Sequence, residues 1–423
     1  MMNILVLGNG AREHALCFSI AKSDQLSKLF CAPGNYGISK IAEVHNFDIN
    51  NFDTLYDFCL ANKIDLVVVG PEVPLVNGVV DFLDSKKIMA FGPKKIPAGL
   101  EGSKIFMKDI CSKYNIPTAA YKSFTEKKLA CDYLKNHTFP VVIKASGLAA
   151  GKGVTIATSL NDGLLAVNDI FNDKFGSGCE LVIEEFMDGE EASYFVFTDG
   201  TNYIPLSSAQ DHKRIGDGDT GPNTGGMGAY SPAPVFTKEI QKQVDQEMIE
   251  PTLKAMRDLG SPYQGILYAG VMIKNNKAKL VEYNVRFGDP ECQVLMLRLK
   301  SDIVDLILGT INGNISSIRT NWEENHAATV VMASLGYPNE YKKDTKIKNL
   351  ELAENENDIE IFHAGTELKN TELCAVGGRV LSITGTGNDL QTALNKIYTA
   401  IDKIDWPEST FRKDIGWRAI NNG

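Results

Sequence analysis

Residues 3–13 of the chain read NILVLGNGARE, an apolar run that ends in a glycine-rich turn and leads into a helical pattern. The same order recurs over the first hundred residues, with turns at Pro33-Gly34-Asn35, Gly70-Pro71-Glu72 and Gly92-Pro93. Strands that alternate with helices are typical of a parallel, doubly wound sheet. In such a sheet, ligands bind beyond the carboxyl ends of the strands, where these turns lie.

The pattern changes after about Gly102. Strand-like runs such as 193–198 and 267–273 are often joined by short turns, which is typical of an antiparallel α+β unit. A third set of strand and helix patterns begins near residue 326. The polar, glycine-rich stretch 210–231 has almost no apolar periodicity, so we expect a long loop there, either functional or disordered.

The chain is acidic, with 43 lysines and arginines against 53 aspartates and glutamates and a net charge of −10 over 423 residues. We therefore expect no nucleic-acid and no membrane partner. Its eight cysteines include no pair at C-x-x-C spacing, which argues against a zinc ribbon and favours reduced thiols in a cytoplasmic protein. The first residues have no basic segment followed by a long apolar one, so no signal peptide is expected.

The turn Gly8-Asn9-Gly10 begins like a dinucleotide-binding motif, but Glu13 stands where the third glycine would be. A carboxylate at that position disfavours a pyrophosphate. The interpretation that fits best is a small-anion site made by backbone amides at the start of a helix. A tight turn without a ligand is the alternative.

A second glycine-rich segment, 147–153, follows a strand that carries Lys144. It is one residue too short for a P-loop, and glycine replaces the Ser or Thr that would follow its lysine, Lys152. A glycine loop beside a strand lysine can still cover a polyphosphate with its amides and neutralise its charge. The alternative is a hairpin without a ligand.

The strand pattern over 279–286 places Glu282, Asn284 and Arg286 on one face, because side chains alternate along a strand. Glu282 and Asn284 offer oxygen ligands of the kind that Mg²⁺ accepts. Arg286, about 7 Å from Asn284 along the strand, could clamp a carboxylate or phosphate. The alternative is an exposed sheet face with salt bridges.

Another strand pattern, 181–186, leads into an acidic turn. An exposed hinge backbone beside an apolar side chain suits adenine, and Glu190 or Glu191 suits the ribose diol. A solvated acidic turn is the commoner meaning of such a run.

A series of motifs follows along the chain in this order: GNGAREHAL, APGNYG, VGPEVPLV, FGP, LEGSK, VIKASGLAAGKGV, VIEEFMDGEEAS, QDHKRIGDGDTGPNTGGMGAYSPAP, YAGVMI, EYNVRFGDPE, FHAGT, GGRVL and RKDIGWRAI. The ordered set resembles the phosphoribosylamine–glycine ligase (glycinamide ribonucleotide synthetase) family of the ATP-grasp superfamily. The match runs from Gly8 to Trp417, and its most specific parts are the loop after Gln210 and the strand with NVRFGDPE.

This resemblance implies an α/β and α+β multidomain fold. An N-terminal doubly wound parallel sheet spans 1–101, an ATP-grasp core spans 102–325 with a mobile lid at about 120–190, and a C-terminal α/β domain spans 326–423. The implied reaction converts ATP, 5-phosphoribosylamine and glycine into ADP, phosphate and glycinamide ribonucleotide through glycyl phosphate. It needs alignment and charge neutralisation rather than a protein nucleophile, and the sequence shows no nucleophile motif.

Site residues are implied wherever the motifs match. Those implied for ATP are Lys104, Lys144, Gly151, Lys152, Gly153, Glu184, Glu185, Phe186, Met187 and Glu191. Those implied for Mg²⁺ or Mn²⁺ are Glu282 and Asn284. Those implied for glycine and phosphoribosylamine are Gly8, Asn9, Gly10, Asn35, Glu72, Asp211, Lys213 and Arg286, of which Asp211, Lys213 and Arg286 are the expected catalytic residues.

Two other functions stay open from the residues. Another ATP-grasp ligase, such as a carboxylase or a D-alanine ligase, would share the ATP and metal positions but not the loop 210–234. A nucleotide-binding oxidoreductase or a non-catalytic sensor could be built on the N-terminal sheet, although Glu13 argues against NAD. We expect a monomer or a weak homo-oligomer.

Overall fold

The computed structural model describes residues 1–148, 153–172 and 180–421. Its first unit consists of β1 (Met2–Gly8), α1 (Ala11–Ile20), β2 (Leu26–Pro33), β3 (Glu43–Val44), α2 (Phe52–Ala61), β4 (Leu66–Val69), α3 (Glu72–Asn77), α4 (Val79–Ser85) and β5 (Met89–Phe91). The five strands form one parallel sheet in the order β3-β2-β1-β4-β5. Ile4 and Val6 of β1 pack in one hydrophobic cluster and Leu5 and Leu7 in another, so both faces of this sheet are buried. The predicted doubly wound sheet is confirmed.

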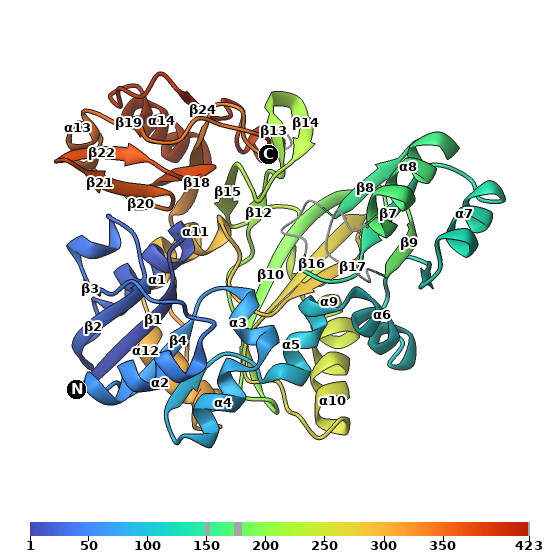
Figure 1. Cartoon of the computed structure of the whole chain (residues 1–423), viewed down its shortest axis with the longest axis horizontal. Helices are drawn as coiled ribbons and strands as arrows, with labels where there is room; N and C mark the ends of the chain where they lie inside the picture. Colours follow the sequence, from blue (N-terminus) through green and yellow to red (C-terminus); the bar gives the residue numbers. More distant parts are fainter. Residues whose placement is uncertain (149–152, 173–179, 422–423) are drawn as a thin grey trace.

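A small second unit projects from the molecule at the right of Figure 1. We call it the lid. Its elements are β6 (Tyr121–Phe124), α7 (Lys127–Lys135), β7 (Val141–Ala145), β8 (Val154–Ala157), α8 (Leu160–Phe171) and β9 (Leu181–Glu185). The strands pair antiparallel in the order β6-β9-β7-β8, and the lid has its own hydrophobic cluster around Val141, Ile143 and Val167. The lid is therefore built as a separate packing unit.

The central unit is an antiparallel sheet with helices against it. Its elements are α5 (Lys95–Gly102), α6 (Lys104–Lys113), β10 (Glu190–Thr198), β11 (Tyr203–Pro205), α9 (Lys238–Val244), α10 (Glu250–Asp258), β16 (Gly265–Lys274), β17 (Lys277–Asn284), α11 (Glu291–Arg298) and α12 (Ile303–Ile311). The strand order is β11-β10-β16-β17. One hydrophobic cluster contains Leu75 of the N-terminal unit together with Tyr194 and Leu280 of this sheet, so the two units share a core.

The last unit mixes strands from two distant parts of the chain. Its elements are β12 (Gln210–Asp211), β15 (Gly228–Ser231), β18 (His326–Ser334), β19 (Thr345–Lys346), α13 (Leu350–Glu354), β20 (Ile359–His363), β21 (Thr366–Lys369), β22 (Glu372–Ala375), β23 (Arg379–Gly387), α14 (Leu390–Ile401), β24 (Ser409–Thr410) and α15 (Trp417–Asn421). The main sheet runs β12-β15-β18-β23-β20, with β24 also on β18. No helix in the described part of the chain has the length and apolar character that a membrane crossing requires.

The long loop expected over 210–231 is therefore wrong. β12 pairs with β15, β15 pairs with β18, and between β12 and β15 the strands β13 (Arg214–Gly216) and β14 (Thr220–Asn223) form a hairpin. Strands of two to four residues are too short to show an alternating pattern, and the partner of β15 lies about a hundred residues later in the sequence.

A segment near the C-terminus fastens this hairpin. The guanidinium of Arg412, whose side chain is fully buried, donates to both carboxylate oxygens of Asp414 at 2.7 Å, to Asp219 at 2.8 Å and to the carbonyl of Arg214. The Gly416 amide donates to His212 Nε2 at 2.9 Å, and Arg418 pairs with Asp219. Through these contacts, residues 412–418 anchor the β13–β14 hairpin and the neighbouring His212.

We expect Arg412→Met to lower the melting temperature by about 5 °C or more, because removing one partner of a buried ion pair costs about 3–5 kcal/mol. Scanning calorimetry measures this, with Lys413→Met at the exposed neighbouring position as the control. Equal melting temperatures for the two variants would contradict the role given to Arg412.

Candidate active site

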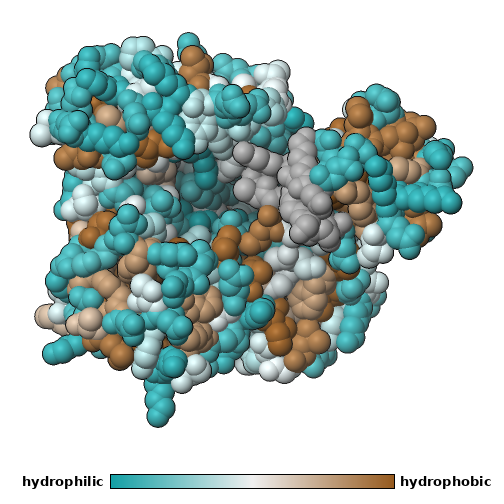
Figure 2. Space-filling view, in the orientation of Figure 1, coloured by the Kyte–Doolittle hydropathy of each residue, from teal (hydrophilic) through white to brown (hydrophobic). Residues whose placement is uncertain are grey.

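A cavity of about 580 Å³ lies where the four units meet. Figure 2 shows it as a hydrophilic hollow in the face of the molecule. Its wall includes Arg12 from the N-terminal unit, Lys144 from the lid, Glu282 from β17 and Arg379 from the C-terminal unit. A ligand in this cavity would touch every part of the fold.

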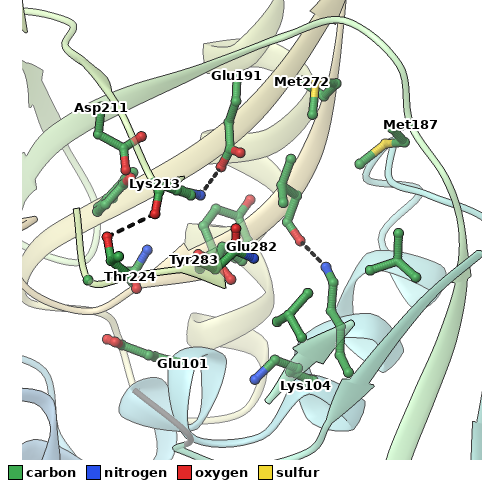
Figure 3. Close-up of a pocket in the computed structure, with 18 of the residues that line it drawn as sticks. Glu101, Lys104, Met187, Glu191, Asp211, Lys213, Thr224, Met272, Glu282 and Tyr283 are labelled. Carbon is green, nitrogen blue, oxygen red and sulfur yellow. Dashed lines mark hydrogen bonds and ion pairs between the residues drawn. The ribbon is translucent and has the colours of Figure 1, made fainter. Parts of the chain in front are cut away.

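One end of the cavity is apolar. Val142 and Ile156 of the lid, Met187 after β9, and Met272 and Val281 of the central sheet line it. Figure 3 shows Met187 and Met272 at this end. Glu185 and Phe186 also line the cavity; Glu185 pairs with Lys279 at 2.8 Å, and Phe186 is 41% exposed. These walls suit a flat heterocycle beside a hinge backbone.

Next to the apolar end lie three cationic side chains. Lys104 donates to the carbonyl of Gly147 at 3.2 Å. Lys144 lies 2.9 Å from Glu184, and Lys108 approaches the other oxygen of the same carboxylate at 3.3 Å. Burial lowers the pKa of Lys104, an effect that Glu282 opposes. Lys104 and Lys144 are the two lysines that the sequence assigned to phosphate.

Glu282 and Asn284 both line the cavity from β17, and so do Val281 and Tyr283 at the alternate positions, where the pairing with β16 shifts register. Burial raises the pKa of Glu282, but Lys213, Lys144 and Lys104 together bring it below its ordinary value, so the group is a carboxylate. Among the described residues, no three His, Cys, Asp or Glu side chains are grouped so that they could hold a metal by themselves. Two hard oxygen ligands fit a magnesium ion whose other ligands are phosphates and water.

Arg286 lies two residues after the end of β17, and its long side chain folds back so that Nη2 lies 3.1 Å from Asn284 Oδ1. The guanidinium also pairs with Glu101 at 2.7 Å and with Glu72 at 3.4 Å. Arg286 therefore lies inside a polar network on the cavity wall rather than on an exposed sheet face.

The far end of the cavity holds Asp211 and Lys213. Lys213 forms a short ion pair with Glu191, and the Thr224 hydroxyl donates to the Lys213 carbonyl at 2.8 Å (Figure 3). Burial, opposed by Lys213 and reinforced by Glu291, raises the pKa of Asp211 to about 8. Glu191, assigned to the ribose from the sequence, thus contacts a residue assigned to the acceptor substrates.

The Gly8–Gly10 turn does not line the cavity. The carboxylate of Glu13 fills it, accepting the Gly10 amide and Arg12 Nε at 2.7 Å each. Gly8 has a φ of +124°, and a Cβ there would lie 2.5 Å from Glu13 Cγ, so glycine is required. The amide of Gly10 that an anion would need is therefore taken by Glu13.

Other predicted residues also lie off the cavity wall or outside the described chain. Asn35 donates to the carbonyls of Asn9 and His363 at 2.9 and 2.7 Å and accepts a hydrogen bond from the Ile38 amide. Its side chain therefore links the Gly8–Gly10 turn to the end of β20. The Gly153 carbonyl accepts the Ala145 amide in the hairpin between β7 and β8. Gly151 and Lys152 lie outside the described residues.

Comparisons with known proteins identify the family of the chain. Three family models match in succession: the N domain of phosphoribosylglycinamide synthetase over residues 2–101, its ATP-grasp (A) domain over 102–292 and its C domain over 327–418. The chain belongs to the phosphoribosylglycinamide synthetase family. The resemblance, the fold class and the predicted activity, that of a phosphoribosylamine–glycine ligase of purine biosynthesis that uses ATP, are confirmed.

Individual relatives of this family match along almost the whole chain. A phosphoribosylamine–glycine ligase of Brucella melitensis is 50% identical over 99% of this chain and 98% of its own length. A chloroplastic one of Arabidopsis thaliana is 51% identical over 97% of this chain and 79% of its own. The crystal structure of such a ligase from Thermotoga maritima superposes with a TM-score of 0.85 at 32% identity, covering 98% of this chain and all of that one. A biotin carboxylase domain of Hydrogenobacter thermophilus, at 15% identity and a TM-score of 0.73, shares the fold.

Several residues of the synthetase cavity were not assigned from the sequence. They are Arg12, Glu101, Met272, Tyr268, Glu291, Arg379 and Arg418. Arg12, Glu101, Glu291, Arg379 and Arg418 stand in quoted motifs, which could have singled them out. Glu291 accepts from Tyr268 at 2.8 Å and from Ser193 at 3.1 Å, a pairing that only the tertiary structure shows.

From the raised pKa of Asp211 we predict how the stability of this synthetase depends on pH. Between the ordinary pKa of about 3.9 and about 8, the folded chain binds a proton that the unfolded chain has released, so stability falls as pH rises. Asp211→Asn should remove this loss, by up to about 1.4 kcal/mol per pH unit. Melting temperatures from pH 6 to 8.5 test it, with the exposed Asp57→Asn as control. Parallel curves for wild type and Asp211→Asn would contradict the assignment.

Proposed function

We propose that the cavity ligates glycine to 5-phosphoribosylamine through glycyl phosphate, with ATP between the lid and the central sheet. The observation that carries this proposal is the order of groups along one cavity. An apolar end at Met187 and Met272 is followed by Lys104, then by Glu282, and then by the polar end at Lys213. Lys144 also lines the cavity, and its charge acts on Glu282. That order matches adenine, phosphates, metal and acceptor substrates.

The first step activates glycine. A glycine carboxylate oxygen attacks the γ-phosphorus of ATP, and the bond to the bridging oxygen breaks to release ADP. Lys104 and Lys144 neutralise phosphate charge, the backbone of Glu185–Met187 contacts adenine, and Glu191 contacts the ribose. Glu282 and Asn284 would hold Mg²⁺ or Mn²⁺, which supplies charge neutralisation between the phosphates.

The second step forms the amide. The amine nitrogen of phosphoribosylamine attacks the carbonyl carbon of glycyl phosphate, phosphate leaves, and the nitrogen loses a proton. Asp211 can accept this proton in the fraction of molecules in which it is ionised, since its raised pKa makes its carboxylate a stronger base than an ordinary aspartate but leaves the group mostly protonated below about pH 8. Lys213 and Arg286 stabilise the charge on the reacting oxygens, and Glu72 lies beside Arg286 on the acceptor side.

Gly8, Asn9, Gly10 and Asn35 support this acceptor side indirectly. The turn holds Glu13, Glu13 holds Arg12 at 2.7 Å, and Arg12 lines the cavity. We therefore assign these four residues to the support of Arg12.

The proposal extends to the domain limits, the cellular location and the oligomeric state. Domain limits at 1–101, 102–325 and 326–423, with the lid at about 120–190, are supported by the family matches that begin at residues 2, 102 and 327. Seven unpaired cysteines in the described chain support a cytoplasmic location. A monomer or a weak homo-oligomer is proposed.

A coupled assay of ADP release tests the function. It contains ATP, Mg²⁺, glycine and phosphoribosylamine generated in place, and each substrate is omitted in turn. Release that requires both glycine and phosphoribosylamine supports the proposal. Release that requires bicarbonate or D-alanine instead would assign another ATP-grasp reaction.

We expect Glu282→Ala to abolish turnover while the fold persists, because the cavity face of β17 carries the metal ligand and the opposite face packs in the core. The assay at 0.5–20 mM Mg²⁺, on the order of cellular to saturating amounts, measures the loss. Lys277→Ala, at an exposed position on the same strand, is the control and should be active. Near-normal activity of Glu282→Ala at the lowest Mg²⁺ would remove Glu282 from the metal site.

A further inference from the structure

Three buried charged side chains meet where the lid joins the central unit. Lys108 comes from α6, Glu184 from β9 and Lys144 from β7. The side chains of Lys108, Glu184 and Lys144 are 0%, 2% and 6% exposed. Glu184 Oε2 lies 2.9 Å from Lys144 Nζ, and Glu184 Oε1 lies 3.3 Å from Lys108 Nζ.

This cluster is fixed to the strand that carries the metal ligands. Lys108 Nζ donates to the Thr118 hydroxyl at 2.8 Å, and that hydroxyl donates to the Leu280 carbonyl at 2.7 Å. Lys144 Nζ lies 3.4 Å from the Val281 carbonyl. Both lysines are therefore tied to residues immediately before Glu282.

The charges of the cluster do not cancel. Two ammonium groups share one carboxylate, which leaves one positive charge in a buried place where isolated charge is unfavourable. Within the part of the chain that the structure describes, Glu184 Oε1 accepts no hydrogen bond and has only the longer contact with Lys108. Of the three groups, Lys144 and Glu184 line the cavity, so a phosphate bound there would supply the missing negative charge.

We propose that Lys108 is a positioning residue for the nucleotide. Because Lys108 shares the negative charge of Glu184, Lys144 keeps a net positive charge for phosphate and keeps its position beside Glu282. Without Lys108, Glu184 would neutralise Lys144 in a one-to-one pair. The inference rests on the proposed function only in taking the nucleotide to be ATP.

The test is the binding of MgATP, measured by calorimetry without glycine or phosphoribosylamine, so that it does not depend on the acceptor reaction. Lys108→Met should raise the dissociation constant about tenfold or more, because the local charge falls from one to zero. The double variant Lys108→Met, Glu184→Gln returns the charge to one and should recover most of that loss. Lys113→Met, exposed on the same helix, is the matched control and should bind normally.

Steady-state kinetics distinguish a positioning role of Lys108 from a purely structural one. In Lys108→Met the KM for ATP should rise about tenfold while the KM for glycine stays within about twofold, and Lys108→Arg should restore ATP binding. Lys108→Gln, which keeps a donor for Thr118 without the charge, gives a second variant if Lys108→Met does not fold.

Unchanged ATP binding in the folded Lys108→Met or Lys108→Gln variant would overturn the proposal, as would a double variant no better than the single one. Loss of the fold in both single variants would assign Lys108 to stability alone and overturn it as well. A wild-type chain that binds ATP but does not couple glycine to phosphoribosylamine would instead contradict the proposed function.

Discussion

A cavity that receives a polyphosphate has to hold several cations close together before the polyphosphate arrives, and this constraint shapes the site. Each ammonium or guanidinium would repel its neighbours and lose hydration if it stood alone. The carboxylates of Glu184, Glu191 and Glu101 meet this need, since they pair with Lys144, Lys213 and Arg286 in turn. The wall is thus preorganised, and a ligand can exchange one set of anionic partners for another.

The same constraint explains why the site draws on every unit of the fold. A single sheet edge offers few positions, whereas the lid, β17, the hairpin β13–β14 and the C-terminal unit all contribute charged side chains to the cavity wall. Each contributor is held by contacts outside the cavity. The hairpin depends on Arg412, and Arg12 depends on Glu13 in the first turn.

Much of the fold followed from local patterns. The run NILVLGNG predicts β1 and its turn because apolar residues, glycine and a following helix are all adjacent in sequence. Of the cavity-lining residues named from the sequence, Glu282 and Asn284 came from strand alternation and Lys144 from the glycine-rich loop beside its strand, whereas Glu184 came only from the family resemblance. Local sequence patterns do not reveal contacts between residues that are far apart in the sequence, and the arrangements that the sequence missed depend on such contacts.

Three features show that limit. Lys108, which no sequence motif singled out, is completely buried and contacts Glu184 and Thr118. β15 pairs with β18, almost a hundred residues later, so a glycine-rich stretch looked like a loop. Arg286 turns back to Asn284 because Glu101 and Glu72, from α5 and α3, stand beside it.

The pairing of β15 with β18 also bears on how far the protein can be divided. A segment cut near residue 326 would keep β18, β23 and β20 but leave behind β15, which pairs with β18 on the side away from β23, and β12, which pairs with β15. The backbone amides and carbonyls of that side would then be an open edge, ready to pair with another chain. The C-terminal unit is therefore not an exchangeable module: it can be transplanted or inherited only together with the central segment that completes its sheet.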